Sequence, residues 1–544
     1  MNRREAIKTV AGAALAGSMA GSMAGRIAAQ PPAKGHDHAQ PPTWDDKDAQ
    51  RPKGSHDDAL RRLLDRLAGA DDPAEGVEAL AAFDPATLSP YARLDRDAVL
   101  AGRRMDAQIG KGWPYGIVGE TPYAVSPVAG AWRRAGTGAS ADAATIDRET
   151  DRLRADAAQG VRLPRPLLDQ TIAAVLGAAV LGAAVSGAAA DAGAHGAGPA
   201  ADALRRQAAA LSALREASPA EPGVWQLPRG DAYYAAMLRR QCGGAITPAQ
   251  AHRRFLKEAE ALSRRADSLM RGMGMDRGTV GDRFRTLSDD PRWLYSDDDA
   301  GRDTAVADMN RWLDRSRARL PALLGPVPGD MAAIRVLRMT PADEARGRSG
   351  YRRLPGGTQA GAYFVDLKDI RRRPSWTLPG VVHHELLPGH LAQAAFAALA
   401  PAHPLRERYA PGFSEGWAIY AERLMAADGA FASDPRAELG HLHWMMFRIC
   451  RALVDTGVHY RRWSLSEART TVAALQGNAV AFAPMERDME RICMAPGNRA
   501  AEALTWLGIA DLRAGAGGRM IPFHATLLRN GPVPLAFLAG DPGM

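Results

Sequence analysis

Three histidines and a glutamate lie within one short apolar stretch, and these are residue types that bind zinc and activate water. The stretch reads VVHHELLPGHLAQ, from Val381 to Gln393. It contains the parts of the zinc-binding pattern H-E-x-x-H with two additional residues between the histidines. His384 and His390 are six residues apart, so a regular helix, advancing about 100° per residue, would point them to different faces. A metal site here therefore requires a distorted helix.

Pro388 and Gly389 supply a reason for that distortion. A proline inside a helix removes a hydrogen bond and collides with the carbonyl four residues before it, which belongs to His384. The glycine adds backbone freedom. If the Pro-Gly pair is looped out as a two-residue bulge, His384 and His390 become equivalent to an i, i+4 pair. Glu385 then lies beside the metal, where it can act as a general base.

A third ligand is available in the segment GFSEGWAIYAERL. Glu415 follows His390 by 25 residues, at the expected start of a new helix. Two histidines and one glutamate with an open water position form a catalytic zinc set. Glu422 lies seven residues later on the same face and is expected to orient a ligand. His383 is an alternative to His384, but it is two helical turns from His390, a long span for one ion.

The elements that position these residues are mainly helical. Apolar residues recur at helical spacing from Ala59 to about Leu323, in a chain of 544 residues that is 46% hydrophobic. One segment, Gly361–Ile370, alternates and is aromatic, as is typical of a strand. We expect an N-terminal helical lobe over residues 56–330 and a catalytic lobe over residues 331–544. Further helices are predicted at Gly380–Ala400, Ser414–Ala427, Pro435–Tyr460, Ser466–Leu475, Pro484–Met494 and Arg499–Leu512.

The N-terminus has the features of an export signal. Arg3 and Arg4 precede a mild Ala- and Gly-rich segment that extends to about Ala24. The pair favours a twin-arginine signal peptide over residues 1–29, followed by a disordered linker over residues 30–55. The protein is therefore expected to be periplasmic or secreted. Thr171–Ala190 is uncharged and about as long as a bilayer is thick, but Ala and Gly insert poorly, so no stable membrane span is expected.

Composition narrows the possible partners. The net charge of +8 arises from arginines interspersed with acidic residues, and no nucleic-acid-binding motif is present, so no nucleic-acid partner is expected. Cys242, Cys450 and Cys493 lie far apart without a C-x-x-C pair. Neither a thiolate zinc site nor a disulfide scaffold is expected. One buried disulfide between two of these cysteines is the alternative that the sequence leaves open. The sequence carries no indication of the oligomeric state.

Four motifs follow one another along the chain: HELLPGH, EGWAIYAE, RALVDTGVH and FHATLLRNGPVPL. This ordered series resembles the domain of unknown function 885 family, which belongs with the gluzincin-like metallopeptidases, and the likeness covers nearly all of the mature chain. It implies a mainly α, multi-helix, gluzincin-type metallopeptidase fold with a small β-sheet beside the active-site cleft. By the same resemblance, the strand at Gly361–Ile370 is expected to be an edge strand that aligns an extended peptide, with Tyr363 lining the cleft.

The chain departs from the family pattern at five positions. The family commonly has a second His after P-G-H, and its later motif R-Y…P-G-Q-A-x-x-Y-K has Tyr, Gln, Tyr and Lys. These departures indicate a divergent branch of the family, with altered specificity or low activity. The residues found here are Leu391, Ile492, Asn498, Glu502 and Ala503.

Together the motifs predict peptide hydrolysis with one Zn²⁺ ion. Glu385 would take a proton from water and deliver it to the leaving amine. A group opposite the metal must stabilise the tetrahedral intermediate, and His459 and Arg491 are the leading candidates. Tyr460 and Tyr363 follow, while Asp455, four residues before His459, is expected to orient that imidazole.

The predicted function is that of an exported zinc metallopeptidase whose substrates are oligopeptides. The first alternative is a catalytically weakened periplasmic protein that binds peptides or metal. It rests on Leu391 and the altered Pro-Gly-Asn segment, whereas the presence of Glu385 argues against it, because a protein that only binds needs no general base. A zinc hydrolase of another amide or ester would use the same residues and is the second alternative.

Overall fold

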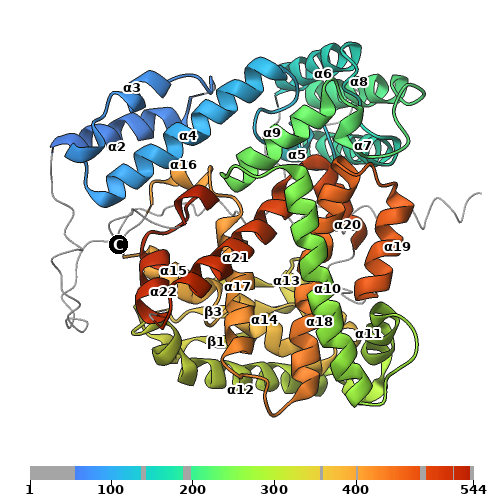
Figure 1. Cartoon of the computed structure of the whole chain (residues 1–544). Coiled ribbons are helices and arrows are strands. Elements are labelled where there is room, and N and C mark those ends of the chain that lie inside the picture. Colours follow the sequence, from blue (N-terminus) through green and yellow to red (C-terminus); the bar gives the residue numbers. More distant parts are fainter. Residues whose placement is uncertain are drawn as a thin grey trace, which may run out of the picture.

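The protein is predominantly helical, with one small sheet (Figure 1). The computed structural model describes residues 55–70, 72–135, 142–187, 198–355, 359–399, 402–477, 485–518 and 520–538. The predicted signal peptide, residues 1–29, and the predicted linker, apart from Ser55, lie outside these residues. The mainly α fold expected from the sequence is confirmed.

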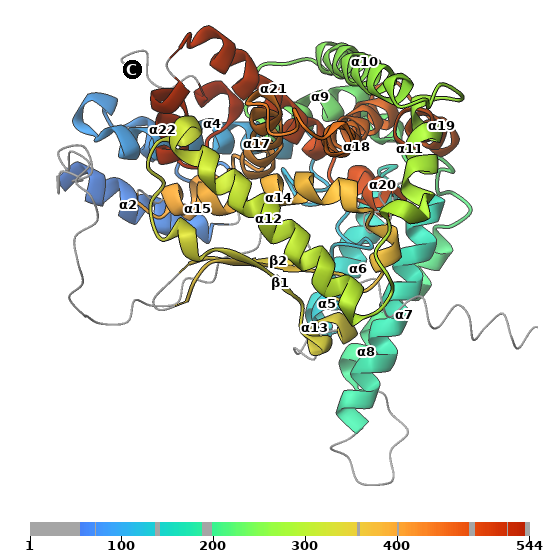
Figure 2. The same cartoon turned by 90° about the horizontal axis from the view of Figure 1, so that it is seen from below.

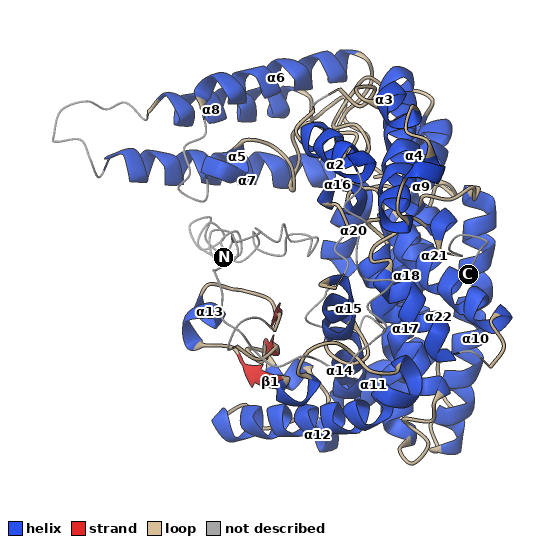
Figure 3. Cartoon of the chain, turned by 90° about the vertical axis from the view of Figure 1, so that its left-hand side faces the viewer, coloured by secondary structure: helices blue, strands red, loops and turns tan. Residues whose placement is uncertain are grey.

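The first half of the described chain is built from helices alone. Two of them, α7 and α8, pack against each other and extend away from the rest of the molecule (Figures 2 and 3). The helices are α2 Ser55–Ala68, α3 Val77–Ala81, α4 Pro90–Gly112, α5 Trp132–Ala135, α6 Ala143–Ala158, α7 Arg165–Gly187, α8 Pro199–Ala213, α9 Gly230–Cys242, α10 Pro248–Gly272, α11 Val280–Asp289 and α12 Asp299–Leu324.

Helix α10 illustrates how sequence fixes these elements. It begins at a capping box in which the Thr247 side chain accepts from the backbone of Gln250 and the Gln250 side chain accepts from the backbone of Thr247. Its apolar residues recur every three or four positions and are buried, so this face packs against the core. They are Ala251, Phe255, Ala259, Leu262, Ala266 and Met270.

The second half carries the helices that surround the candidate site. Helix α18 is buried along almost all of its length and packs against α10, α14, α17, α19, α20 and α21. A helix buried on every side belongs to the core. The helices are α13 Pro341–Ala345, α14 Leu378–Glu385, α15 His390–Ala397, α16 Pro404–Glu407, α17 Phe413–Ala427, α18 Pro435–His459, α19 Leu465–Gln476, α20 Met485–Met494, α21 Asn498–Gly515 and α22 Met520–Arg529.

The sheet has the order β1-β3-β2. Strand β3, Ala362–Val365, pairs in parallel with β1, Arg335–Arg338, and antiparallel with β2, Tyr351–Arg353. The strand predicted at 361–370 is therefore present but shorter, and its expected edge position is wrong, because β3 has a partner on each side. In the described sheet, β1 and β2 are the edges. Helix α12 lies against β1, where the amide of Asn310 bonds both the N–H and the C=O of Val336.

The apolar core is continuous across much of the chain. One cluster of buried side chains includes residues from Ile109 to Leu538, and a smaller cluster joins α2 and α4 to α16 through residues such as Leu60, Leu100 and Leu405. Within the described residues, none of the helices is both long and apolar enough to cross a membrane.

Candidate metal centre

The helix that carries the histidines is interrupted between them. Helix α14 ends at Glu385 and α15 begins at His390, so the prediction of one helix with a two-residue bulge is wrong. The Leu387–Pro388 bond in the connection is cis. Gly389 is required by close approach, since a Cβ there would lie 2.0 Å from the carbonyl oxygen of His384.

The break is held by hydrogen bonds from both sides. The carbonyl of Leu386 accepts from the N–H of Leu391 at 3.2 Å, which closes the turn into α15. The indole N–H of Trp417, on α17, donates to the carbonyl of Pro388 at 3.1 Å. Helix α17, which carries the third candidate ligand, is thereby attached directly to the connection between the two histidines.

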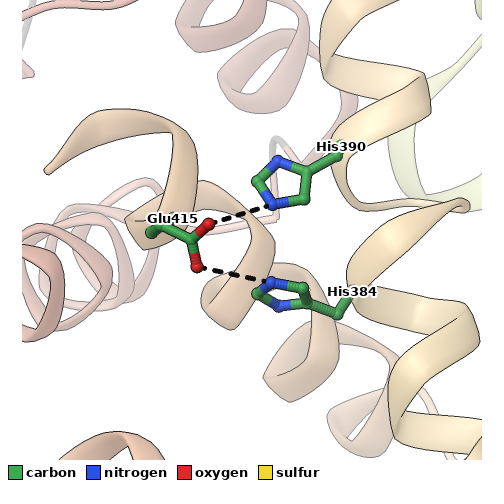
Figure 4. A group of neighbouring side chains, drawn as sticks. All are labelled: His384, His390 and Glu415. Carbon is green, nitrogen blue, oxygen red and sulfur yellow. Dashed lines mark ion pairs between the residues drawn. The ribbon is translucent and has the colours of Figure 1, made fainter. Parts of the chain in front are cut away.

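His384, His390 and Glu415 come together across this break (Figure 4). One potential ligand atom from each residue can be chosen so that all three lie within 4.8 Å of one another. The Nε2 atoms of His384 and His390 lie 3.4 Å and 3.5 Å from the two oxygens of Glu415. The alternative residue, His383, lies outside the group and packs against Trp312 and Phe431.

Hydrogen bonds orient both imidazoles toward the centre of this group. Nδ1 of His384 donates to Oε1 of Glu422 at 2.8 Å, so its Nε2 faces Glu415. Nδ1 of His390 lies 3.2 Å from Oγ of Ser414, whose hydroxyl donates to Oε1 of Gln393. Nε2 of His390 is buried and has no hydrogen-bond partner in the described chain. In the neutral tautomers that these bonds favour, both Nε2 atoms carry a lone pair for a metal.

For Glu415 and His384, neighbouring charges outweigh the effect of burial on the pKa. Burial alone would raise the pKa of Glu415, but the two adjacent imidazoles hold it well below its usual range. Burial and Arg448 lower the pKa of His384, whereas Glu415 and Glu422 raise it, and the net direction is upward. The pKa of His390 falls to about 4, mainly because of burial and then because of Arg352. A neutral His390 is the form that can ligate a metal.

Glu385 lies next to the group and is 21% exposed, so it is accessible from solvent. Its carboxylate forms an ion pair with Arg352 of β2. Burial alone would raise the pKa of Glu385, and Arg352 together with the two histidines lowers it. Arg352 stands opposite Tyr363 in the sheet, and Tyr363 is buried there, where burial raises its pKa. No motif or spacing in the sequence indicated Arg352, which precedes Glu385 by 33 residues.

The structure does not bring His459 into this group. Its Nδ1 accepts from the N–H of Val224 at 3.2 Å, and its Nε2 donates to the carbonyl of Ile492 at 2.9 Å. Both ring nitrogens thus bond to backbone in the core. The expectation that Asp455 orients this imidazole is wrong, because the carboxylate of Asp455 accepts instead from the Tyr234 hydroxyl and from the backbone where α21 begins. Tyr460 follows directly, as the C-cap of α18.

Arg491 lies on α20 and interacts electrostatically with a buried network of charged side chains. In that network Asp488 pairs with Arg451 and with Arg499 at 2.8 Å each, and Glu502 pairs with Arg499 at 2.5 Å. Glu502 occupies a position where the family pattern has Tyr. Three helices, α18, α20 and α21, are joined by these ion pairs.

The other four departures from the family pattern lie on α15, α20 and α21. Leu391 is buried in the apolar core. Ile492 is buried and supplies the carbonyl that bonds His459, Asn498 is the first residue of α21, and Ala503 is buried on that helix.

Comparisons with known proteins identify the family and the fold of the chain. A family model for bacterial proteins of unknown function, DUF885, matches residues 42–541. The chain belongs to the DUF885 family. Comparison with curated proteins finds no match.

Two solved structures share the fold of this DUF885 member. One is described as "the putative lipoprotein from Colwellia psychrerythraea", with 23% identity, a TM-score of 0.68, and coverage of 89% of this chain and 90% of that one. The other, from Shewanella oneidensis, is described as a "putative lipoprotein of unknown function", with 15% identity, a TM-score of 0.65, and coverage of 90% and 93%. At these identities the likeness establishes the fold alone.

Proposed function

We propose that this DUF885 protein is an exported zinc-dependent peptidase of gluzincin type whose substrates are oligopeptides. The observation that carries the proposal is the grouping of His384, His390 and Glu415 next to the carboxylate of Glu385. The first three residues offer a ligand set and the fourth a base. Arg3 and Arg4 support export, as do the two structural neighbours described as lipoproteins.

The ligand set fits a zinc ion. In a tetrahedral site with ligand distances of about 2.1 Å, ligand atoms lie roughly 3.4 Å apart. The Nε2 atoms of His384 and His390 lie near this spacing from Glu415, at 3.4 Å and 3.5 Å, each from a different oxygen of its carboxylate. The buried, unpartnered Nε2 of His390 is further support, since a buried polar atom needs a partner and a metal supplies one. Two nitrogen ligands and one oxygen ligand with an open position are typical of catalytic zinc.

When bound, zinc would acidify a water molecule and polarise the substrate carbonyl. The carboxylate of Glu385 takes the proton of the attacking water as a C–O bond forms to the carbonyl carbon. Arg352 keeps that carboxylate ionised and therefore able to accept a proton. The C–N bond then breaks, and Glu385 delivers the proton to the leaving amine. Glu422 and Ser414 hold the two imidazoles in their orientations throughout.

The ion pair of Glu385 with Arg352 is also the observation that favours the alternative of a binding protein. A carboxylate whose charge is compensated by an arginine is a weaker base, and a protein that only binds peptides or metal would not need Glu385 to be free of such a pair. A zinc hydrolase of another amide or ester would use the same arrangement.

Metal analysis combined with a peptide-library digest separates these functions. We expect about one zinc per chain in wild type and in Glu385→Gln, because Glu385 is not a ligand. Only wild type should cleave peptides, as read by mass spectrometry. Glu260→Gln, at an exposed position on α10, serves as the matched control and should cleave like wild type. Equal digests from wild type and Glu385→Gln would refute the peptidase proposal.

A further inference from the structure

Peptide hydrolysis by this site needs a hydrogen-bond donor or a positive group beside the substrate's carbonyl oxygen. His459 is committed to backbone groups and Arg352 to Glu385. We propose that Arg448 is the residue that binds the negative charge developing on that oxygen. This inference rests on the proposed hydrolytic function and adds a catalytic residue that the sequence motifs did not indicate.

Arg448 reaches the atoms that would hold the metal. It lies on α18, and its Nη2 is 3.3 Å from Nε2 of His384 and 3.9 Å from Oε1 of Glu422. The side chain is only 12% exposed. The guanidinium therefore lies at the edge of the ligand group, where it would meet the oxygen of a substrate bound beside His384.

Among the described residues, the carboxylate that pairs with Arg448 is at the long distance of 3.9 Å. That carboxylate belongs to Glu422, whose Oε1 already accepts from His384 at 2.8 Å. The Nε atom of Arg448 is buried without a hydrogen-bond partner in the described chain, as are those of Arg451 and Arg499, so the carboxylate distances make the difference. Arg451 and Arg499, by contrast, each pair with a carboxylate at 2.8 Å. Burying a charge without a close partner is unfavourable and is typical of a group that awaits a ligand.

Two aromatic rings hold the guanidinium in place. Its central carbon lies 5.5 Å from the ring centre of Trp444 and 5.7 Å from that of Phe447. The Trp444 ring is itself fixed, because its N–H donates to the carbonyl of Thr377 at 2.9 Å. A planar guanidinium stacks on such rings and presents its N–H groups in a fixed fork, which a lysine cannot reproduce.

The present acceptor of Arg448 is an atom that the metal needs. A metal held by Nε2 of His384 would take the lone pair that Arg448 now contacts, and the N–H of Arg448 would then be available to donate to a substrate oxygen. Water then attacks the carbonyl carbon, its proton passes to Glu385, and the carbonyl π electrons move to the oxygen that Arg448 contacts. No bond forms to Arg448 itself. Because Arg448 competes with the metal for Nε2, its removal should not weaken zinc binding.

The test compares wild type, Arg448→Met and Arg448→Lys as full-length proteins. Arg436→Met is the control, since Arg436 is on the same helix and stacks on Trp293 at 4.2 Å. Zinc affinity is measured by chelator competition, and kcat and KM on a peptide that wild type cleaves. For Arg448→Met we expect kcat to fall about 100- to 1,000-fold, KM to change little, and zinc affinity to stay equal or increase. Arg448→Lys should recover part of kcat.

Two results would overturn the proposal. An unchanged kcat in Arg448→Met is one. The other is a loss of zinc affinity that parallels the loss of kcat, because Arg448 would then act by supporting His384.

A binding measurement tests the same residue without hydrolysis. Inorganic phosphate serves as an anionic probe, titrated by calorimetry into zinc-loaded wild type and Arg448→Met. Phosphate should bind at least about 10-fold more weakly to the variant, since one charge-assisted contact is lost. Equal phosphate affinities would refute an anion-binding role for Arg448. If wild type binds phosphate in this way but cleaves no peptide, the proposed peptidase function fails while the anion site at Arg448 stands.

Discussion

Gly389→Ala should separate the folding of the protein from its ability to hold a metal. The added Cβ would lie 2.0 Å from the carbonyl oxygen of His384 and 2.5 Å from that of His383, both of which are backbone atoms. Real Cβ atoms essentially never come within 3.0 Å of such neighbours, so the chain must open by about 1 Å between α14 and α15. His390 is the next residue and must move with it.

The magnitude follows from comparing that shift with the tolerance of a metal site. Zinc–ligand distances are held to within about 0.2 Å, so a displacement of about 1 Å removes His390 from effective ligation. We expect zinc affinity to fall at least about 100-fold, equivalent to about 2.7 kcal/mol. The free energy of unfolding should fall by about 1–3 kcal/mol, the usual effect of overpacking. Chelator competition measures the first quantity and denaturant unfolding of the metal-free protein the second.

Gly177→Ala is the matched control. Gly177 lies in α7, and a Cβ there meets nothing within 4 Å. Because alanine favours a helix over glycine, this variant should gain up to about 1 kcal/mol of stability and bind zinc like wild type. If Gly389→Ala also bound zinc like wild type, the tight connection between α14 and α15 would not be what sets the ligand geometry.

Three further predictions concern the surroundings of the site. Glu422→Gln should weaken zinc binding about 10- to 100-fold in chelator competition, because His384 loses the carboxylate that orients it, and Glu438→Gln, on the surface of α18, should not. Zinc at 100 times its Kd should stabilise wild type by about 2.7 kcal/mol in thermal unfolding and should not stabilise His390→Ala. For His459, burial lowers the pKa to about 4, so the unfolded chain binds its proton near pH 6.5 while the folded chain does not. The free energy of unfolding should therefore fall between pH 6.5 and pH 4 by up to roughly 3 kcal/mol from this residue, and a denaturation series in which His459→Gln shows the same slope as wild type would contradict this.

The helices and the three candidate ligands could be predicted from the sequence because the patterns that indicate them are local. Helical periodicity predicted elements such as α10 and α18, and the positions of Pro388 and Gly389 indicated that the histidine helix must distort. How the histidine helix distorts could not be predicted from the sequence. A bulge and a complete break satisfy the same spacing, and the break depends on Trp417 bonding the connection from another helix.

Long-range contacts account for what the sequence missed. Strands β1 and β2 have four and three residues, too short for an alternating pattern to stand out. Asp455 and His459 are four residues apart, which predicts one shared helix face. That spacing does not predict that the Asp455 carboxylate accepts instead from the backbone where α21 begins. Arg352 comes from a strand far from Glu385 in sequence and became visible only through the sheet.

The departures from the family pattern rearrange charge around the candidate site without removing its ligands. Where the family has Tyr, Glu502 pairs with Arg499, and Asp488 pairs with both Arg499 and Arg451. Two arginines are thereby matched by two carboxylates in a buried network that ties α18 to α20 and α21. The positive charge of Arg448, one turn before Arg451 on the same helix, is not matched in this way. Anion binding should therefore be concentrated at the ligand group rather than in the network. A substitution of Glu502 should accordingly alter stability more than it alters phosphate binding at zinc-loaded protein.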